Sequence, residues 1–238
     1  MMATEEAGWD EGEEPLNGRA AGAVATKAGR GPPPPQKISM CGLLSVQFYQ
    51  PYFDVNTSEV KMRLLQAAWP VRKTSSSFLE EGESSQQADL YGPVWVSATL
   101  IFLISVAANA RRGMTSDASA GEFSEVSTSA YCVLAYLAVG SAGLWAFFRA
   151  HDVPLSSSEA LSVYGYSLTP FLAAAPLCLF SWPFRSSGLA MASLLAAIFV
   201  LRSSWPRLVE HMPEKSKGLL LAAVATYHVF SFLLLTVV

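Results

Sequence analysis

The sequence predicts an all-α fold: a polytopic membrane bundle of five transmembrane helices, preceded by a mostly disordered cytosolic N-terminal tail that contains one amphipathic helix. Of the 238 residues, 51% are hydrophobic and only 15% are charged, whereas about 25% are charged in an average soluble domain. The charges are also unevenly placed, because residues 1–92 hold 8 of the 16 Lys and Arg and 12 of the 19 Asp and Glu. The rest of the chain is therefore apolar enough to lie largely within a bilayer.

Five apolar stretches are long enough to cross a membrane, because about 20 helical residues, each rising about 1.5 Å, span a hydrocarbon core of about 30 Å. The fourth stretch is the weakest. Its uninterrupted apolar part covers only residues 188–201, so Arg202 must extend its guanidinium to the interface. A re-entrant or interfacial segment is the alternative there. The five stretches cover about residues 93–110, 129–148, 161–181, 188–205 and 218–238.

Two prolines and one histidine distinguish the interior of the predicted bundle. Pro170 and Pro176 should kink the third span, since proline removes a backbone donor and clashes with the preceding turn. His228 is the only ionisable side chain in the fifth span. We interpret it as a histidine that is hydrogen-bonded within the bundle or faces the interface, and a proton relay is the alternative.

The distribution of lysine and arginine predicts the orientation, because basic residues in short loops stay on the cytosolic side of a membrane. Five spans place the two termini on opposite sides. A cytosolic N-terminus and a lumenal C-terminus put more basic residues in the cytosolic loops. These loops hold Arg149, Arg202, Arg207, Lys215 and Lys217, against Arg111, Arg112 and Arg185 on the other side. The first thirty residues contain no apolar stretch typical of a cleavable signal peptide.

The N-terminal part divides into three segments before a membrane domain at residues 89–238. Residues 1–37 combine an acidic run with four consecutive prolines, a composition that buries too little apolar surface to fold. A ligand for an SH3 or WW domain is the alternative interpretation of the prolines. Residues 38–70 are apolar and aromatic, and residues 71–88 form a polar linker. Acylation of Cys41 stays open.

One amphipathic helix is predicted before the linker. Asn56 can cap its N-terminus, with Glu59 at the third helical position as in a capping box. The helix should end near Pro70. It has two candidate roles: packing on the bundle or the bilayer, or docking a cytosolic partner. At helical spacing, the expected apolar face comprises Val60, Leu64, Leu65, Ala68 and Trp69.

A short motif, Asp89-Leu90-Tyr91-Gly92-Pro93, precedes the first span. Pro93 suits the first turn of a helix, and Gly92 permits a sharp turn before it. Asp89 can complement the positive N-terminal end of that helix, and Tyr91 suits the aromatic belt at a membrane interface. These roles are compatible with simple anchoring of the span.

Several short motifs occur along the chain, and their combination and order identify a protein family more specifically than any single motif does. They are the aromatic segment of residues 48–57 (FYQPYFDVNT), the Asp89-Leu90-Tyr91-Gly92-Pro93 motif, Asn109 at the end of the first span, and Tyr164-Gly165-Tyr166-Ser167-Leu168. Together with the five spans, they resemble the Yip family of Rab-interacting membrane proteins of the early secretory pathway and Golgi. The resemblance covers about residues 45–238.

The resemblance implies a non-enzymatic protein of the Golgi membrane that also cycles through the endoplasmic reticulum. We predict that it supports vesicle-mediated transport by binding Rab GTPases or associated trafficking machinery through its cytosolic tail. Its bundle would associate with other Yip-type membrane proteins. The residues predicted to contact the cytosolic partner are Phe48, Tyr49, Tyr52, Phe53, Asp54 and Leu64.

Two other classes of function were weighed against this hypothesis. A small-molecule or lipid transporter would use the kinked third span as its substrate site, although the predicted spans offer no carboxylate or lysine for an ion pathway. An enzyme has less support, because no HExxH, GxSxG, Walker or Cys/His metal motif occurs. We therefore predict no catalytic, cofactor-binding or metal-ligating residue. A net charge of −3 gives no basic footprint for nucleic acid.

Overall fold

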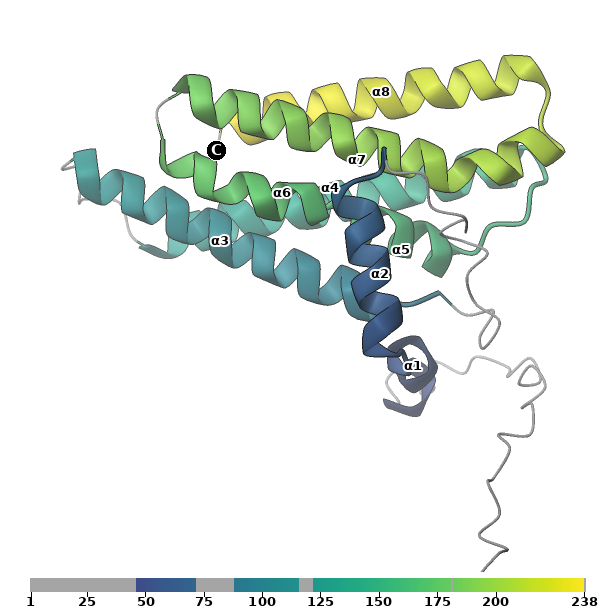
Figure 1. Ribbon diagram of the computed structural model, residues 1–238, viewed down its shortest axis with the longest axis horizontal. Helices are drawn as coiled ribbons and strands as arrows, with labels where there is room; N and C mark the ends of the chain where they lie inside the picture. The colour runs from purple at the N-terminus through teal and green to yellow at the C-terminus, as the bar shows by residue number, and fades with distance from the viewer. Residues whose placement is uncertain (1–45, 72–87, 116–121, 181, 238) are drawn as a thin grey trace, which may run out of the picture. The chain divides into compact units, whose positions relative to one another are not determined.

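The computed structural model describes residues 46–71, 88–115, 122–180 and 182–237, and every regular element within these ranges is helical (Figure 1). The tail of residues 1–37, Cys41 and nearly all of the linker lie outside the described residues. The elements are α1 (Val46–Phe53), α2 (Thr57–Ala68), α3 (Tyr91–Thr115), α4 (Glu122–Ala150), α5 (Ser157–Ser167), α6 (Thr169–Ala174), the 3-10 helix η2 (Ala175–Leu179), α7 (Trp182–His211) and α8 (Glu214–Val237).

Five helical segments among the described residues are long and apolar enough to cross a membrane, which confirms the predicted five-span bundle. The fourth segment is a continuous helix of 30 residues. It is therefore long enough to span, and the reason for a re-entrant alternative disappears. The segments are Tyr91–Met114, Ser124–Ala150, Ser157–Leu179, Trp182–His211 and Glu214–Thr236.

The third span is interrupted rather than merely bent. α5 ends at Ser167, and α6 begins after Leu168 with Pro170 in its first turn. Pro176 lies in the first turn of η2. Because proline lacks an N–H but suits the first turn of a helix, the two expected kinks take the form of two helix restarts. This span is also the most enclosed: 67% of its apolar 18-residue stretch is buried, against at most 44% of the corresponding stretch in the other four.

The packing places the interrupted span at the centre of the bundle. α5 contacts α3, α4 and α7, while α7 pairs with α8 and α3 pairs with α4 along their lengths (Figure 1). Large side chains fill the space around α5, and the most enclosed of them are Phe148, Tyr166 and Phe171. The core of the molecule therefore forms around the span that is least regular.

α2 runs across the direction of the bundle helices (Figure 1) and contacts α3, α5, α6 and α7. The start of α3, the end of α4, the start of α5 and the end of α7 lie at one end of the bundle, and α2 is attached there to Asp89, just before α3. We call this end of the bundle the α2 end. α2 thus realises the first of the two roles weighed for the amphipathic helix, because one of its faces packs on the bundle.

The buried face of α2 differs from the predicted face. Leu65 and Trp69 were expected on it, but they are 61% and 64% exposed. Ala67 is fully buried instead, and Leu64 packs against the core. The rotation follows from Arg63, whose guanidinium turns inward to reach a buried carboxylate described below. An ion pair thus decides the face of this helix where apolar periodicity alone suggested another.

The N-terminus of α2 lies where the sequence predicted it, but the capping box does not form. The Asn56 amide Nδ2 donates to Glu59 Oε1 at 3.0 Å, and the Asn56 side chain accepts no bond from a backbone N–H. The backbone carbonyl of Asn56 accepts from the amides of Glu59 and Val60. The asparagine therefore holds the glutamate side chain, and the helix begins without a side-chain cap.

Candidate functional site

Asp89 is the centre of a buried polar junction at the α2 end. Its residue is only 1% exposed, so its carboxylate must be compensated by nearby donors. Oδ1 accepts the backbone N–H of Tyr91 at 2.6 Å, which caps the start of α3 as predicted. Oδ2 lies 3.0 Å from Arg63 Nη1 and also accepts the hydroxyl of Tyr166. One carboxylate therefore joins α2, α3 and α5.

Two glycines allow the same three segments to interlock. A Cβ on Gly92 would lie 2.0 Å from Cζ of Tyr166, and a Cβ on Gly165 would lie 2.2 Å from Cβ of Pro93. Such distances are far below van der Waals contact, so only glycine fits at either position. The motif before the first span and the motif in the third span are therefore two halves of one packing arrangement.

The aromatic segment before α2 joins this junction through the backbone. The N–H of Leu90 donates to the carbonyl of Tyr52 at 3.1 Å. Tyr52 belongs to α1, so α1 is held beside the start of α3. All three of the longer motifs singled out in the sequence thus meet at the α2 end, although more than 100 residues separate the first from the last.

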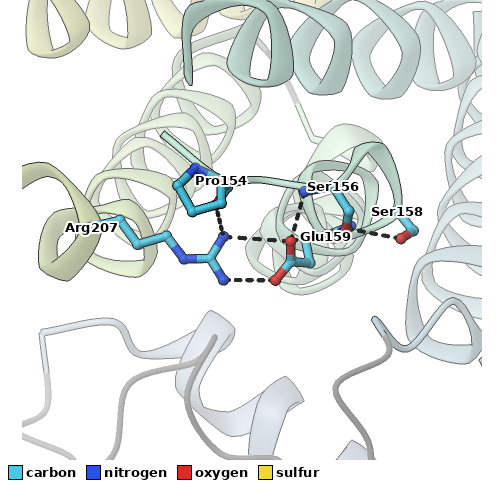
Figure 2. Close-up of polar contacts among 5 residues, drawn as sticks. All are labelled: Pro154, Ser156, Ser158, Glu159 and Arg207. Atoms are coloured by element: carbon cyan, nitrogen blue, oxygen red, sulfur yellow. Dashed lines mark hydrogen bonds and ion pairs between the residues drawn. The ribbon is translucent and has the colours of Figure 1, made fainter. Parts of the chain in front are cut away.

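A second polar cluster closes the α2 end at the start of α5 (Figure 2). Ser156 and Glu159 form a complete capping box. Arg207 Nη2, on α7, donates to Glu159 Oε1 at 2.7 Å, and Nη1 donates to the Pro154 carbonyl at 3.0 Å. The cluster therefore fixes the loop before α5 to the end of α7.

Arg202, on the same helix, has a more specific role than the expected extension to the interface. Its Nη1 donates to the carbonyl of Pro70 at 2.5 Å. The fourth span thereby holds the C-terminal end of α2. Two contacts therefore attach α2 to the bundle. Arg63, near the middle of α2, binds Asp89, and Arg202 of α7 binds the Pro70 carbonyl just after the end of α2.

An aromatic cluster lies deeper in the bundle, around Tyr164 and Ser167 of the Tyr164-Gly165-Tyr166-Ser167 motif. Tyr136 hydrogen-bonds Ser167 through their hydroxyls at 2.9 Å. Tyr164 packs edge-on against Tyr136, with ring centroids 5.8 Å apart, and a Cβ on Gly140 would clash with its ring. The Tyr227 hydroxyl donates to the carbonyl of Tyr136. The cluster ties α4, α5 and α8 together.

His228 lies in this cluster and differs from its prediction. The residue is only 2% exposed, so its side chain does not face a membrane interface. Its ring stacks on Tyr164 at 6.3 Å and meets Tyr136 edge-on at 5.7 Å. Within the described residues, neither ring nitrogen has a hydrogen-bond partner. The histidine is therefore held by aromatic packing and not by hydrogen bonds.

Replacing His228 by leucine is expected to stabilise the bundle. An unpaired buried polar group costs about 1–3 kcal/mol, and leucine has a similar volume without polar atoms. The melting temperature of the purified protein in detergent should therefore rise. Ser193→Ala is a suitable comparison, because its hydroxyl donates to the His228 carbonyl at 2.9 Å and its loss should destabilise. A lower melting temperature for His228→Leu would show that the imidazole has a polar partner.

The structure distributes the predicted partner-contacting residues over two environments. Tyr49, Phe53 and Asp54 are exposed on or just after α1, and Tyr52 is half-buried beside them. Leu64 packs against the core. Phe48 lies in α1, and its side chain is outside the described part of the structure.

The motif residues also separate into two groups. Asp89, Gly92, Pro93, Gly165 and Tyr166 form the junction at the α2 end, and Leu90 joins it through its backbone. Tyr91 is partly exposed beside Trp95, as an interfacial aromatic residue would be. Tyr164 and Ser167 belong to the aromatic cluster, and Asn109 is half-buried in α3.

Three residues with central roles were not singled out by the sequence. Arg63 looks like an ordinary polar position of an amphipathic helix, although it lies one residue before Leu64 on the buried side. Tyr136 and Tyr227 are aromatic residues in apolar spans, where nothing local marks them. One feature of the sequence could have identified all three residues. Each carries a hydrogen-bonding group within or beside a membrane segment, where such groups require partners.

The charged groups of the junction are bound to one another. Among the described residues, no three His, Cys, Asp or Glu side chains gather as a metal site would require. The Asp89 carboxylate is saturated by three donors. What the α2 end provides is a rigid platform on which α1 and α2 present exposed side chains.

The molecule has five apolar spans, of which the interrupted third lies at the centre, and a short helix is fixed across one end. This architecture defines a polytopic helical membrane protein with a docked N-terminal helix. The family model of the Yip1 domain matches residues 72–238. The chain belongs to the Yip family, as the sequence motifs predicted.

One curated relative is Protein YIPF1 homolog of Dictyostelium discoideum, which is 29% identical over 187 residues. The match covers 75% of this chain and 51% of the relative. The chain therefore spans about half the length of that relative. No solved structure matches the chain.

Proposed function

We propose that this Yip family membrane protein acts in the Golgi and early secretory pathway, where it supports vesicle-mediated transport by binding Rab GTPases or associated machinery. The role is non-enzymatic. The observation that carries the proposal is the attachment of α2 to the bundle through Asp89 and of α1 through the Leu90 backbone, which leaves exposed aromatic side chains on both helices. Family membership supports the trafficking context.

The proposed orientation places the α2 end in the cytosol and the C-terminus in the lumen. Basic residues in short loops mark the cytosolic side of a membrane protein. The α2 end and its adjoining loop carry more of them than the opposite end, which has Arg111, Arg112 and Arg185. This orientation makes α1 and α2 accessible to cytosolic partners. Other Yip-type proteins would associate through the lipid-facing sides of the bundle.

The proposed contact surface for the GTPase consists of exposed apolar residues on α1 and α2. Tyr49 and Phe53 on α1 are 43% and 40% exposed, while Leu65 and Trp69 are exposed on α2. Buried aromatic anchors dominate the energetics of protein interfaces, and here such anchors are already ordered on a fixed support. Leu64 lies on the opposite, buried side of α2 and supports this surface indirectly, because it packs α2 against the core.

The test is binding of purified Rab GTPases to the full-length protein in detergent. Tyr49→Ala combined with Phe53→Ala should weaken binding at least about thirtyfold, because even one hot-spot aromatic contributes at least about 2 kcal/mol. Trp182→Ala removes an exposed aromatic at the opposite end and should leave the affinity unchanged. Equal affinities for wild type and the double variant would reject this surface. Absence of binding to every Rab tested would reject the function.

A transporter is the second candidate, and the interrupted third span is the observation that favours it. Broken helices with free backbone groups line the substrate sites of many transporters, and here the break lies beside a buried histidine. Flux of small solutes or phospholipids in proteoliposomes tests this candidate. Flux that disappears in Pro170→Ala and Pro176→Ala would support it, while an inert wild-type protein would remove it.

A further inference from the structure

An open groove of about 440 Å³ lies at the α2 end, between α1, the last turns of α4 and the first turns of α5. The volume falls within the range of about 300–1,000 Å³ that small-molecule sites occupy. Most of the lining is apolar or aromatic, with serine hydroxyls on the side of α5. Its principal lining residues are Tyr49, Tyr52, Ala142, Trp145, Ser158 and Leu161.

The position of the groove along α4 points to a lipid ligand. Ala142 and Trp145 are exposed on a helix that is long and apolar enough to cross the membrane, and they lie near its last residue, Ala150. The groove therefore opens at the depth where acyl chains meet headgroups, which is also where tryptophan accumulates. A lipid reaches such a groove from the bilayer itself.

The charges beside the groove favour an anionic headgroup. The Arg149 guanidinium carbon lies 5.6 Å from the centroid of the Trp145 ring, so a positive charge lies directly above a lining residue. Glu159, in the first turn of α5, is paired with Arg207 (Figure 2). Its negative charge is thereby compensated. Arginine and serine hydroxyls are suitable donors for phosphate oxygens.

We propose that this groove binds one anionic glycerophospholipid. Its acyl chains lie against Trp145 and Leu161. Its headgroup, whose net negative charge distinguishes it from the zwitterionic headgroup of phosphatidylcholine, is bound by Arg149 and the Ser158 hydroxyl. Because Tyr49 and Tyr52 form one wall, the bound lipid also connects α1 to the bundle. The presentation of α1 then depends on the lipid composition of the membrane. This inference does not rest on the identity of any protein partner.

The experiment measures lipid retention by the full-length protein. Protein purified in detergent is incubated with micelles of palmitoyl-oleoyl phosphatidylserine or phosphatidylcholine, and native mass spectrometry counts the retained lipids. Wild type should retain phosphatidylserine about tenfold more strongly, the effect of one charge-assisted hydrogen bond. Arg149→Gln should abolish this preference. Ala142→Trp should lower retention of both lipids by filling the groove.

Lys215→Gln is the matched control, because it removes an exposed positive charge from the first turn of α8, outside the groove lining. It should keep the wild-type preference. A preference that persists in Arg149→Gln would overturn the proposal, and so would undiminished retention in a folded Ala142→Trp. In the latter case the groove would be free for a protein segment. Arg149→Gln alone decides the question if Ala142→Trp does not fold.

Discussion

Arg63→Met is expected to lower the free energy of unfolding by about 3–5 kcal/mol, the cost of removing one partner of a buried ion pair. Asp89 is almost fully enclosed, and its Oδ2 faces Arg63 at 3.0 Å. Methionine preserves much of the packing of the arginine stem but none of the charge. The carboxylate would then retain only the Tyr91 amide and the Tyr166 hydroxyl as donors. Thermal unfolding of the detergent-purified protein measures the loss.

Lys61→Met is the matched control for this prediction, since Lys61 is an exposed cation on the same helix. It should change stability by less than about 0.5 kcal/mol, as most surface substitutions do. The double variant Arg63→Met with Asp89→Asn should be less destabilised than the sum of the two single variants. Each single variant leaves one buried charge without its partner, whereas the double variant leaves none. Equal stabilities for Arg63→Met and Lys61→Met would show that this ion pair does not hold α2.

Hydrogen exchange separates local release of α2 from general destabilisation in the same variant. If Arg63 fixes α2 to the bundle, the amides of Thr57–Ala68 should exchange faster in Arg63→Met, while those of α7 and α8 keep their protection. Release of α2 would also pull on α1, because only three residues join the two helices, and it would strain the hydrogen bond between the Leu90 N–H and the Tyr52 carbonyl. The ion pair thus connects stability with presentation of the proposed partner surface.

The five spans could be predicted from the sequence because they depend on a local property. A helix in a bilayer satisfies its own backbone and needs only about 20 apolar residues, whatever its neighbours are. The break near Pro170 was predictable for the same reason, since proline acts on its own helix. The end of α2 near Pro70 also follows from local chemistry.

The buried face of α2 could not be predicted, because it depends on residues distant in the chain. Apolar periodicity placed Leu65 and Trp69 inward, but Arg63 must reach Asp89, which lies 26 positions further on. Removing water from the carboxylate without a cation would cost more than exposing two apolar side chains. A similar limit applies to Asn56, whose amide donates to Glu59 in place of accepting a backbone bond.

The motif before the first span illustrates how a correct local reading can be incomplete. Asp89 does complement the helix start, and Tyr91 does lie partly exposed. Simple anchoring would require nothing more. The structure adds the contacts of Gly92 and Pro93 with the third span, 72 or more residues away in the chain. The motif is therefore a packing element whose other half is Gly165-Tyr166.

Gly165→Ala is expected to have the second largest effect, a loss of about 3 kcal/mol in the free energy of unfolding, at the upper end of the range for overpacking. The added Cβ would lie 2.2 Å from Pro93 Cβ and 2.6 Å from its Cα. A backbone atom in the first turn of α3 cannot move aside as a flexible side chain can. The helices would therefore have to separate, and the Tyr166 hydroxyl would shift from Asp89. Thermal unfolding in detergent measures the effect.

Gly143→Ala tests whether the loss of stability in Gly165→Ala comes from the contact with Pro93. The alternative is that replacing any helical glycine by alanine destabilises this protein. No atom lies within 4 Å of the Cβ position at Gly143, on α4. In an open helical position alanine is favoured over glycine by about 1 kcal/mol, so Gly143→Ala should be neutral or slightly stabilising. Opposite signs for the two variants would follow only if α3 and α5 touch at Pro93 and Gly165. Matching signs would mean that the two motifs do not interlock, and Asp89 would then need another explanation for its burial.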